Sequence, residues 1–305
     1  MDQLTRKAYA KINLGLDALR KRADGYHELA MVMQTVDICD ELTFAVKETP
    51  GIELYVEWSK DGWTDTALDS FPKEGEAQPV PSDQKNLVWR AAELLMEEFE
   101  IKKGVKITLK KKIPVAAGMA GGSSDCAATL HGINELFELG LSLEELQARG
   151  VKLGADVPYC LLGGTALAEG IGEILTPLSP MPMCHLVAAK PAVSVSTPFV
   201  FKQLRVDELE EHPDIAGVCA AIRDNDLDGV IDRLGNVLET AAIPHFPVVG
   251  DLKEELKRLG ADGVLMSGSG PTVFAIFKSE TQAHEAFDEL KKTGLAAQIF
   301  VTRPV

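Results

Sequence analysis

Residues 114–125 read Pro-Val-Ala-Ala-Gly-Met-Ala-Gly-Gly-Ser-Ser-Asp, a glycine-rich turn that leads into a helix-compatible run from Cys126 to Leu136. Glycine lets the backbone approach a ligand without a Cβ in the way. The start of a helix adds unpaired N–H groups and the positive end of a dipole, so the turn favours a bound phosphate group. It matches neither the Walker loop nor Gly-x-Gly-x-x-Gly. The alternative is an ordinary loop in which a Ser or Asp side chain caps the helix.

A strand and a basic cluster precede this glycine loop. Val105, Ile107 and Leu109 alternate with polar residues, which predicts a strand that leads into the loop. The cluster Lys110–Lys112 follows directly. Two interpretations stay open: the lysines favour a small polyanion near the loop, or they are solvated side chains at the end of a strand.

The first residues of the chain predict another strand. Apolar residues alternate with polar ones from Ala8 to Leu16, which is typical of a half-buried strand. The period of two places Tyr9, Lys11 and Asn13 together on its non-core face.

The rest of the N-terminal half reads as mixed helix and sheet. Strands are expected at residues 41–46 and 52–56, with a glycine-bent strand pair at 164–175. Asn86 is expected to cap one helix, and Ser142 with Glu145 to form a capping box for another. The segment Trp58–Lys85 is rich in Asp, Pro, Gly and Ser and has no period, so we expect a long surface excursion.

The C-terminal half predicts a second domain. Its expected elements are a strand at 185–190, helices out to Gly260, strands at 263–266 and 272–277 joined by Ser267-Gly-Ser-Gly-Pro, a helix capped by Ser279 and Gln282 that ends near Gly294, and a strand at 297–301. This order is the split β-α-β order of ferredoxin-like domains. Pro177, Pro180 and Pro182 mark the expected boundary. The fold class is therefore α+β with two domains.

Composition excludes several classes of protein. The net charge of −15 disfavours a nucleic-acid surface, and no stretch approaches the length of a membrane span. The five cysteines are odd in number and contain no Cys-x-x-Cys pair, so we expect neither a disulfide framework nor a zinc site, and a cytoplasmic location fits best. The histidines other than His27 show no metal-ligand spacing and are expected to be structural.

Five motifs occur in a characteristic order: Ala8-Tyr-Ala-Lys-Ile-Asn-Leu, Ala23-Asp-Gly-Tyr-His-Glu-Leu, the glycine loop, Leu153-Gly-Ala-Asp-Val-Pro, and Leu265-Met-Ser-Gly-Ser-Gly-Pro-Thr-Val-Phe. In order and wording they resemble the GHMP kinase superfamily over nearly the whole chain. The resemblance implies an N-terminal α/β nucleotide-binding domain over residues 1–178 and a C-terminal ferredoxin-like substrate domain over 179–305. The excursion is longer than the family pattern requires, and we assign it no role.

The resemblance implies an activity, namely ATP-dependent transfer of a phosphoryl group to a hydroxyl of a cytidine diphosphate methylerythritol. Asp156 matches the general base of the family, since a carboxylate can accept the proton of the attacking hydroxyl. The alternative is a helix N-cap ahead of Val157-Pro158. Lys11 matches the partner that keeps Asp156 ionised and stabilises the transferring group. The alternative is a solvent-exposed lysine.

The resemblance also implies how ligands bind. ATP phosphates would lie on Pro114, Ala117, Gly118, Met119, Ala120, Gly121, Gly122, Ser123 and Ser124. Mg²⁺ should accompany ATP, with Ser124 contacting metal or phosphate and no acidic residue standing out as a ligand.

The acceptor would contact Asn13, Tyr26, His27, Phe201 and Gly268, with Tyr26 stacking on the base and His27 reading its edge. Simpler alternatives are a solvated Asn13, a polar turn at Asp24-Gly25, a core Phe201 and a plain β-hairpin loop at Gly268.

Three rival functions remain. The first is a homoserine, mevalonate or sugar kinase of the same superfamily, the second a non-catalytic ligand sensor on the same fold, and the third a nucleic-acid-binding protein. We expect a monomer or homodimer that acts on a small molecule, without a nucleic-acid or membrane partner.

Overall fold

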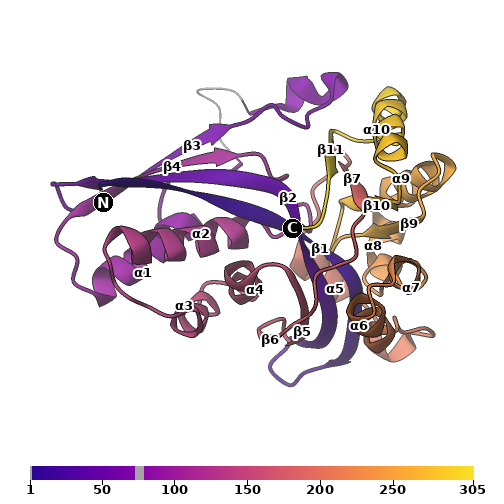
Figure 1. The fold of residues 1–305 in the computed structure, drawn as a ribbon, viewed down its shortest axis with the longest axis horizontal. Coiled ribbons are helices and arrows are strands. Elements are labelled where there is room, and N and C mark those ends of the chain that lie inside the picture. The colour runs from indigo at the N-terminus through magenta and orange to yellow at the C-terminus, as the bar shows by residue number, and fades with distance from the viewer. Residues whose placement is uncertain (1, 73–78) are drawn as a thin grey trace.

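The computed structural model describes residues 2–72 and 79–305, which form two sheets flanked by helices (Figure 1). The strands are β1 (Gln3–Lys21), β2 (His27–Lys47), β3 (Ile52–Trp58), β4 (Gly104–Lys111), β5 (Thr165–Gly170), β6 (Ile174–Pro177), β7 (His185–Lys190), β8 (Gly235–Asn236), β9 (Gly263–Met266), β10 (Val273–Phe277) and β11 (Gln298–Thr302). The helices are α1 (Leu87–Glu98), α2 (Gly121–Leu136), α3 (Leu143–Gly150), α4 (Val157–Leu162), α5 (Thr197–Gln203), α6 (Ile215–Arg223), α7 (Leu227–Ile231), α8 (Glu239–His245), α9 (Pro247–Arg258) and α10 (Glu280–Thr293), with short 3-10 turns η1 (Asp65–Ser70) and η2 (Val206–Glu208).

The first sheet has the strand order β3-β4-β2-β1-β8, and β5 and β6 extend it from β2. Helices α1 to α4 lie along one side of it (Figure 1). Packing is close there, because a Cβ added at Gly132 of α2 would lie 2.6 Å from the Phe44 ring of β2. Strand β8 comes from the C-terminal half and pairs in parallel with β1 at Gly15 and Leu16.

Strand β1 is longer and more deeply buried than its alternating pattern predicts. Residues on both of its faces are buried from Ala10 to Ala18, and Lys11 and Asn13 are only 5% and 0% exposed. The prediction that Lys11 and Asn13 lie on a solvent-exposed face of this strand is therefore wrong. The glycine loop lies beside this part of β1, since the Lys11 N–H donates to Met119 O at 3.2 Å.

Strand β2 also exceeds its predicted range of 41–46. It begins at His27 and pairs with β1 along nearly its whole length. The turn that joins the two strands contains Asp24-Gly25, and the Asp24 carboxylate accepts a hydrogen bond from the Tyr26 N–H at 3.1 Å.

The predicted helix caps are largely confirmed. Asn86 accepts a hydrogen bond from the Val88 N–H, and Ser142 and Glu145 form the expected capping box. Ser279 accepts from the Gln282 N–H, which is one half of the predicted box, and Gly294 ends α10 in the left-handed conformation.

The second sheet confirms the ferredoxin-like prediction. Its order is β11-β7-β10-β9, and every neighbouring pair is antiparallel. The glycine-bent pair predicted at 164–175 is present as β5 and β6. The domain boundary between residues 178 and 179 falls between β6 and β7 and stays a prediction. The chain ends beside the first sheet, where the Val305 N–H donates to Thr35 O at 3.1 Å (Figure 1).

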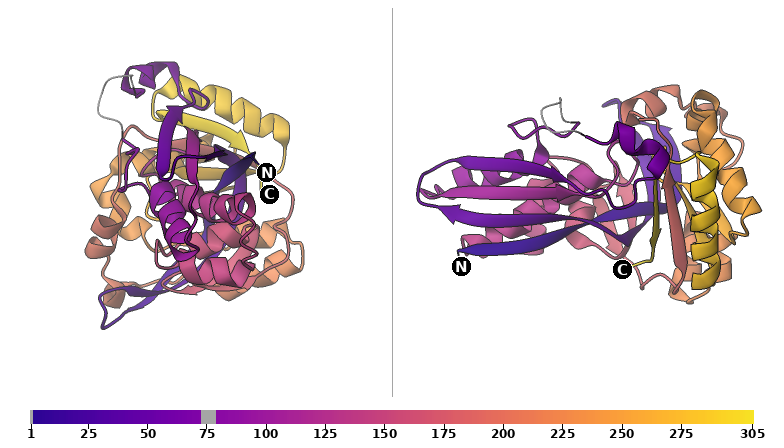
Figure 2. Two further views of the ribbon diagram at one scale, coloured as in Figure 1. Left: turned by 90° about the vertical axis from the view of Figure 1, so that its left-hand side faces the viewer. Right: turned by 90° about the horizontal axis from the view of Figure 1, so that it is seen from above.

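The excursion Trp58–Lys85 is not a free surface loop over its described part. Gly62 O accepts from the Ile299 N–H at 2.7 Å, and the Thr64 N–H donates to Ala297 O at 3.0 Å. The segment therefore continues the second sheet at its β11 edge, and η1 lies close to β11 in the views of Figure 2. Residues 73–78 of the excursion lie outside the described residues.

Within the described ranges, none of the helices carries an apolar stretch of the length that crossing a bilayer requires.

Candidate active site

A cavity of about 880 Å³ opens between the glycine loop of the first sheet and the turn that joins β9 to β10. Most predicted site residues line it: Lys11, Tyr26, His27, Pro114, Ala117, Gly118, Met119, Ala120, Gly121, Gly122, Ser123, Asp156, Phe201 and Gly268. Asn13 and Ser124 are the two that do not. Residues that are far apart in the sequence thus converge on one hollow.

The glycine loop leaves the start of α2 uncapped by any side chain. Ala120 occupies the N-cap position with φ +55° and makes no capping hydrogen bond. The alternative interpretation, a loop whose Ser or Asp caps the helix, is therefore wrong. The first N–H groups of α2 belong to Gly121, Gly122 and Ser123, which line the cavity and suit an anion.

Ser124 requires a correction. Its hydroxyl donates to Tyr9 O at 2.6 Å, and the side chain is buried on the far side of the loop from the cavity. The hydroxyl therefore holds the loop to β1 and does not point at a ligand. Ser123 is the serine of this pair that lines the cavity.

Lys11 and Asn13 form one buried unit. The Lys11 ammonium donates to Asn13 Oδ1 at 2.6 Å, and Asn13 Nδ2 lies 3.6 Å from the Met31 sulfur. Asn13 is fully buried and lies outside the cavity lining, so its contact with the acceptor stays a prediction. The alternative of a solvent-exposed Lys11 is also wrong.

Asp156 stands at the N-cap position of α4, but its side chain makes no capping hydrogen bond. Asp156 therefore occupies the predicted N-cap position, but its carboxylate does not cap the helix. Asp156 lines the cavity instead. Burial raises the pKa of the Cys160 thiol, with Asp156 raising it further and Lys11 lowering it. Asp156 and Lys11 both line the cavity.

The turn Ser267–Gly270 joins β9 and β10 and also touches the first sheet's loop. The Ser267 hydroxyl donates to Gly118 O at 2.9 Å. A Cβ added at Gly118 would lie 2.1 Å from Ser267 O, and one added at Gly268 would lie 3.4 Å from the Lys11 ammonium. The hairpin interpretation holds, the turn also contacts the glycine loop, and the close approach requires glycine at Gly118.

An aromatic group lies at the far end of the cavity. The rings of His27 and Phe201 stack with centroids 5.1 Å apart and planes at 27°. Burial, with Lys21 nearby, lowers the pKa of His27, so the neutral imidazole keeps one donor and one acceptor at pH 7. Tyr26 is 60% exposed, which is unusual for a large aromatic side chain that lines a cavity.

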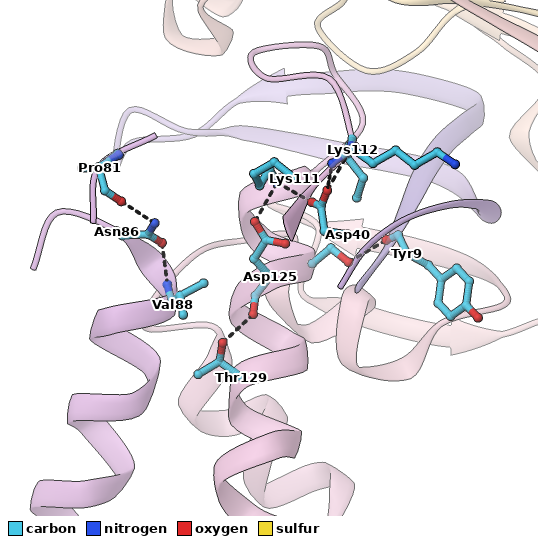
Figure 3. Close-up of polar contacts among 11 residues, drawn as sticks. Tyr9, Asp40, Pro81, Asn86, Val88, Lys111, Lys112, Asp125 and Thr129 are labelled. Carbon is cyan, nitrogen blue, oxygen red and sulfur yellow. Dashed lines mark hydrogen bonds and ion pairs between the residues drawn. The ribbon is translucent and has the colours of Figure 1, made fainter. Parts of the chain in front are cut away.

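A buried ion cluster lies behind the glycine loop, and the sequence interpretation missed it (Figure 3). The Lys111 ammonium pairs with Asp40 and, at 2.7 Å, with Asp125 Oδ2 of α2. Asp40 also accepts hydrogen bonds from the N–H groups of Lys112 and Ile113. Lys111 is therefore not a solvated strand end. Its burial agrees with the alternation of β4, which places Lys111 on the inward face with Leu109.

The charges in this cluster shift one another. Burial raises the pKa of Asp125 well above its usual range, with Lys111 opposing the shift and Asp40 adding to it. Burial disfavours the charged form of Lys111, but its two carboxylate partners outweigh that effect and raise its pKa. Asp125 Oδ1 is buried and has no hydrogen-bond partner.

The return limb of the excursion forms another wall of the cavity. Pro79, Val80, Pro81 and Lys85 line it, followed by Asn86. Besides capping α1, Asn86 donates to Pro81 O at 2.7 Å, which fixes this wall to the helix (Figure 3). The sequence showed the cap at Asn86 and gave no sign of the wall.

The remaining candidate groups offer no second reactive centre. All five cysteines are free thiols, and burial raises the pKa of Cys126 to about 12. Across residues 2–72 and 79–305, no group of three or more His, Cys, Asp or Glu side chains is arranged to hold a metal ion.

Comparisons with known proteins agree with this geometry. Residues 86–164 match the family described as "GHMP kinases N terminal domain", and residues 212–296 match "GHMP kinases C terminal". The sequence is 47% identical over 303 residues to a Lachnoclostridium phytofermentans protein named 4-diphosphocytidyl-2-C-methyl-D-erythritol kinase, covering 99% of this chain and 98% of that one. An Enterococcus faecalis protein of the same name is 45% identical over 301 residues, covering 99% of each.

A solved structure supports the same relationship. The crystal structure of a 4-(cytidine 5'-diphospho)-2C-methyl-D-erythritol kinase superposes with a TM-score of 0.77 at 30% sequence identity, covering 99% of both chains.

Proposed function

The chain belongs to the GHMP kinase family, and we propose that it transfers the γ-phosphoryl group of ATP to a hydroxyl of 4-diphosphocytidyl-2-C-methyl-D-erythritol. The products would be ADP and a phosphomonoester of the acceptor. One observation carries the proposal: a single cavity joins the uncapped glycine loop, the Lys11 and Asp156 side chains, and an aromatic group around Tyr26. The names of the similar proteins supply the acceptor.

ATP phosphates fit the glycine loop. The N–H groups of Gly121, Gly122 and Ser123 start α2 and line the cavity, and the positive end of the helix dipole adds to them. Lys111 also lines the cavity near Gly121, where Asp40 and Asp125 pair with its ammonium. Such preorganised donors stabilise charge on a transferring phosphoryl group without reorganising during the reaction.

Asp156 suits the role of general base. Its carboxylate is free of the capping bond that its position would allow, so it can accept the proton of the attacking hydroxyl. The Lys11 ammonium lines the same cavity and can stabilise the charge of the phosphoryl group in flight. Asn13 fixes the direction of that ammonium.

The aromatic group suits a cytosine base. Tyr26 has an open face on which a base can stack, and such stacking is worth about 1–3 kcal/mol in nucleic-acid complexes. Neutral His27 is held by its stack on Phe201 and can read the hydrogen-bonding edge of the base. A homoserine or mevalonate acceptor would use none of these groups, which favours the cytidyl acceptor over those rivals.

The phosphates of the nucleotide would supply more of the ligands of Mg²⁺ than the protein would. Mg²⁺ in kinases is commonly held by one or two carboxylates together with phosphates and water. Asp125 lines the cavity with one orphaned carboxylate oxygen, so it is the protein group that fits, in place of the expected Ser124. The chemistry that Mg²⁺ would supply when bound is neutralisation of the phosphate charge. The cytoplasmic location and the monomeric or homodimeric state stay predictions.

The substitution Asp156→Asn tests the catalytic assignment. It preserves size and removes the proton acceptor, so turnover should fall by about 10²–10⁴-fold. ATP binding, measured by calorimetry, should be retained because the glycine loop is untouched. Turnover close to that of the unmodified protein would show that Asp156 is not the base.

A further inference from the structure

The second glycine turn is held in place by a short segment of the C-terminal half. Strand β8 reaches across to the first sheet, where Asn236 pairs with Leu16 of β1 and the Val237 N–H donates to Leu16 O at 3.0 Å. The segment is therefore anchored to the same strand that carries Lys11.

The side chain of Asn236 makes three hydrogen bonds to the backbone. Its Nδ2 donates to Met266 O and to Gly268 O, both at 2.8 Å, and its Oδ1 accepts from the Leu238 N–H at 2.9 Å. The side chain is buried. A carboxamide is required here, because it offers two donors and an acceptor on one small group.

The two carbonyls that accept hydrogen bonds from Asn236 belong to Met266 and Gly268, on either side of Ser267. Glu239 adds a third hold, since its Oε1 accepts from the Met266 N–H at 2.9 Å. The Ser267–Gly270 turn lies next to Lys11 and the glycine loop. A Cβ added at Gly268 would lie 3.4 Å from the Lys11 ammonium and 3.0 Å from Gly118 O. A shift of this turn therefore changes the surroundings of Lys11.

We propose that Asn236 is a positioning residue for phosphoryl transfer, which fixes the Ser267–Gly270 turn against Lys11 and the first glycine loop. The inference rests on the proposed function. Asn236 does not line the cavity, so it acts through the turn and not on the ligands. Its loss should therefore lower turnover and leave the binding of ATP and acceptor nearly unchanged.

The substitution Asn236→Asp tests the proposal most sharply, because it keeps the shape and replaces both donors with a carboxylate oxygen that faces two carbonyls. We expect kcat to fall by about 10–100-fold, since small misplacements remote from the chemistry cost up to this much. Both KM values should stay near those of the unmodified protein. Relative to the unmodified protein, activity should recover as pH falls, because a protonated carboxyl regains one donor.

Asn134→Asp is the matched control. Asn134 also clips backbone with its carboxamide, donating to Leu141 O and accepting from the Leu141 N–H, both at 3.0 Å, and it lies outside the cavity lining. It should lose stability without a change in kcat and without the recovery at low pH. Equal effects of the two substitutions on kcat would overturn the proposal, as would a rise in KM alone.

A crystal structure of the Asn236→Asp protein separates this inference from the proposed function. Gly268 should be displaced from Lys11. An unmoved turn overturns the inference whether or not the unmodified protein has the proposed activity, while an inactive unmodified protein overturns only the proposed function. If Asn236→Asp does not fold, Asn236→Ala removes the same hydrogen bonds without the repulsion and should displace the turn in the same direction.

Discussion

The two glycine-rich turns that meet across the cavity are held from behind by different chemistry. The first, Pro114–Asp125, rests on the ion cluster of Lys111, Asp40 and Asp125. The second, Ser267–Gly270, is held by the neutral carboxamide of Asn236. Both turns are glycine-rich, yet only the first lies on a helix N-terminus, and only the first rests on a fully buried ion cluster; the Glu239 carboxylate that holds Met266 at the second turn is partly exposed.

The difference follows from what each turn faces. The first would face a polyphosphate, and Lys111 lies beside Gly121 at the start of α2, paired with Asp40 and Asp125. The second turn lies next to Lys11. Its carbonyls at Met266 and Gly268 accept from the neutral Asn236 carboxamide, and the Glu239 carboxylate that accepts from the Met266 N–H is paired with Lys253.

The largest effect is expected where the ionic brace is broken. Lys111→Met leaves two buried carboxylates without their cation, so the free energy of unfolding should fall by about 3–5 kcal/mol in a urea titration. Lys112→Met is the control, because its exposed pair with Asp61 at 3.5 Å should contribute less than about 1 kcal/mol. Similar losses in the two variants would show that the cluster does not brace the loop.

A smaller effect is expected where the two turns touch. Gly118 has φ +73°, and a Cβ there would lie 2.1 Å from Ser267 O. Gly118→Ala should therefore add backbone strain and overpacking, for a loss of about 2–4 kcal/mol in the free energy of unfolding and weaker ATP binding.

Gly140→Ala is the control that separates backbone strain from the steric contact between the turns. Gly140 has nearly the same φ, +72°, but nothing lies within 4 Å of its added Cβ. It should cost about 1–2 kcal/mol and leave ATP binding unchanged. If both glycine variants cost the same, contact between the turns contributes nothing.

The smallest effect is expected from the single hydrogen bond between the turns. Ser267→Ala removes the 2.9 Å bond to Gly118 O, so stability should fall by about 0.5–1.5 kcal/mol, and kcat should fall less than in Asn236→Asp. Ser142→Ala should cost a similar amount through loss of its cap and leave kcat unchanged. A larger kcat loss in Ser267→Ala than in Asn236→Asp would reverse the order of importance.

The sequence predicts the features that local pattern and motif carry. The caps at Asn86 and Ser142 follow from short stretches of sequence, and the order of the second sheet follows from the order of its predicted elements. The convergence of Lys11 with Asp156 follows from the family resemblance alone. The alternation of β4 could also have placed Lys111 inward. Its partners Asp40 and Asp125 lie on other elements, however, so only the folded chain reveals the cluster.

Other parts of the site have no local signal. Strand β8 has two residues, too few to show a period, so the role of Asn236 depends wholly on tertiary contacts. The excursion has no hydrophobic period in its sequence from which its place could be predicted. In the described part, its backbone forms hydrogen bonds with the β11 segment, and Pro79 and Pro81 line the cavity. The burial of β1 on both faces likewise depends on segments that are far from it in the sequence.

Release of ADP by the purified protein, supplied with ATP, Mg²⁺ and one acceptor at a time, tests the central claim most directly. The acceptors are 4-diphosphocytidyl-2-C-methyl-D-erythritol, homoserine and mevalonate. We predict ADP release with the cytidyl acceptor alone, accompanied by one new phosphomonoester signal in the ³¹P spectrum. Equal release with homoserine or mevalonate, or bound ATP without turnover on any acceptor, would contradict the proposed function.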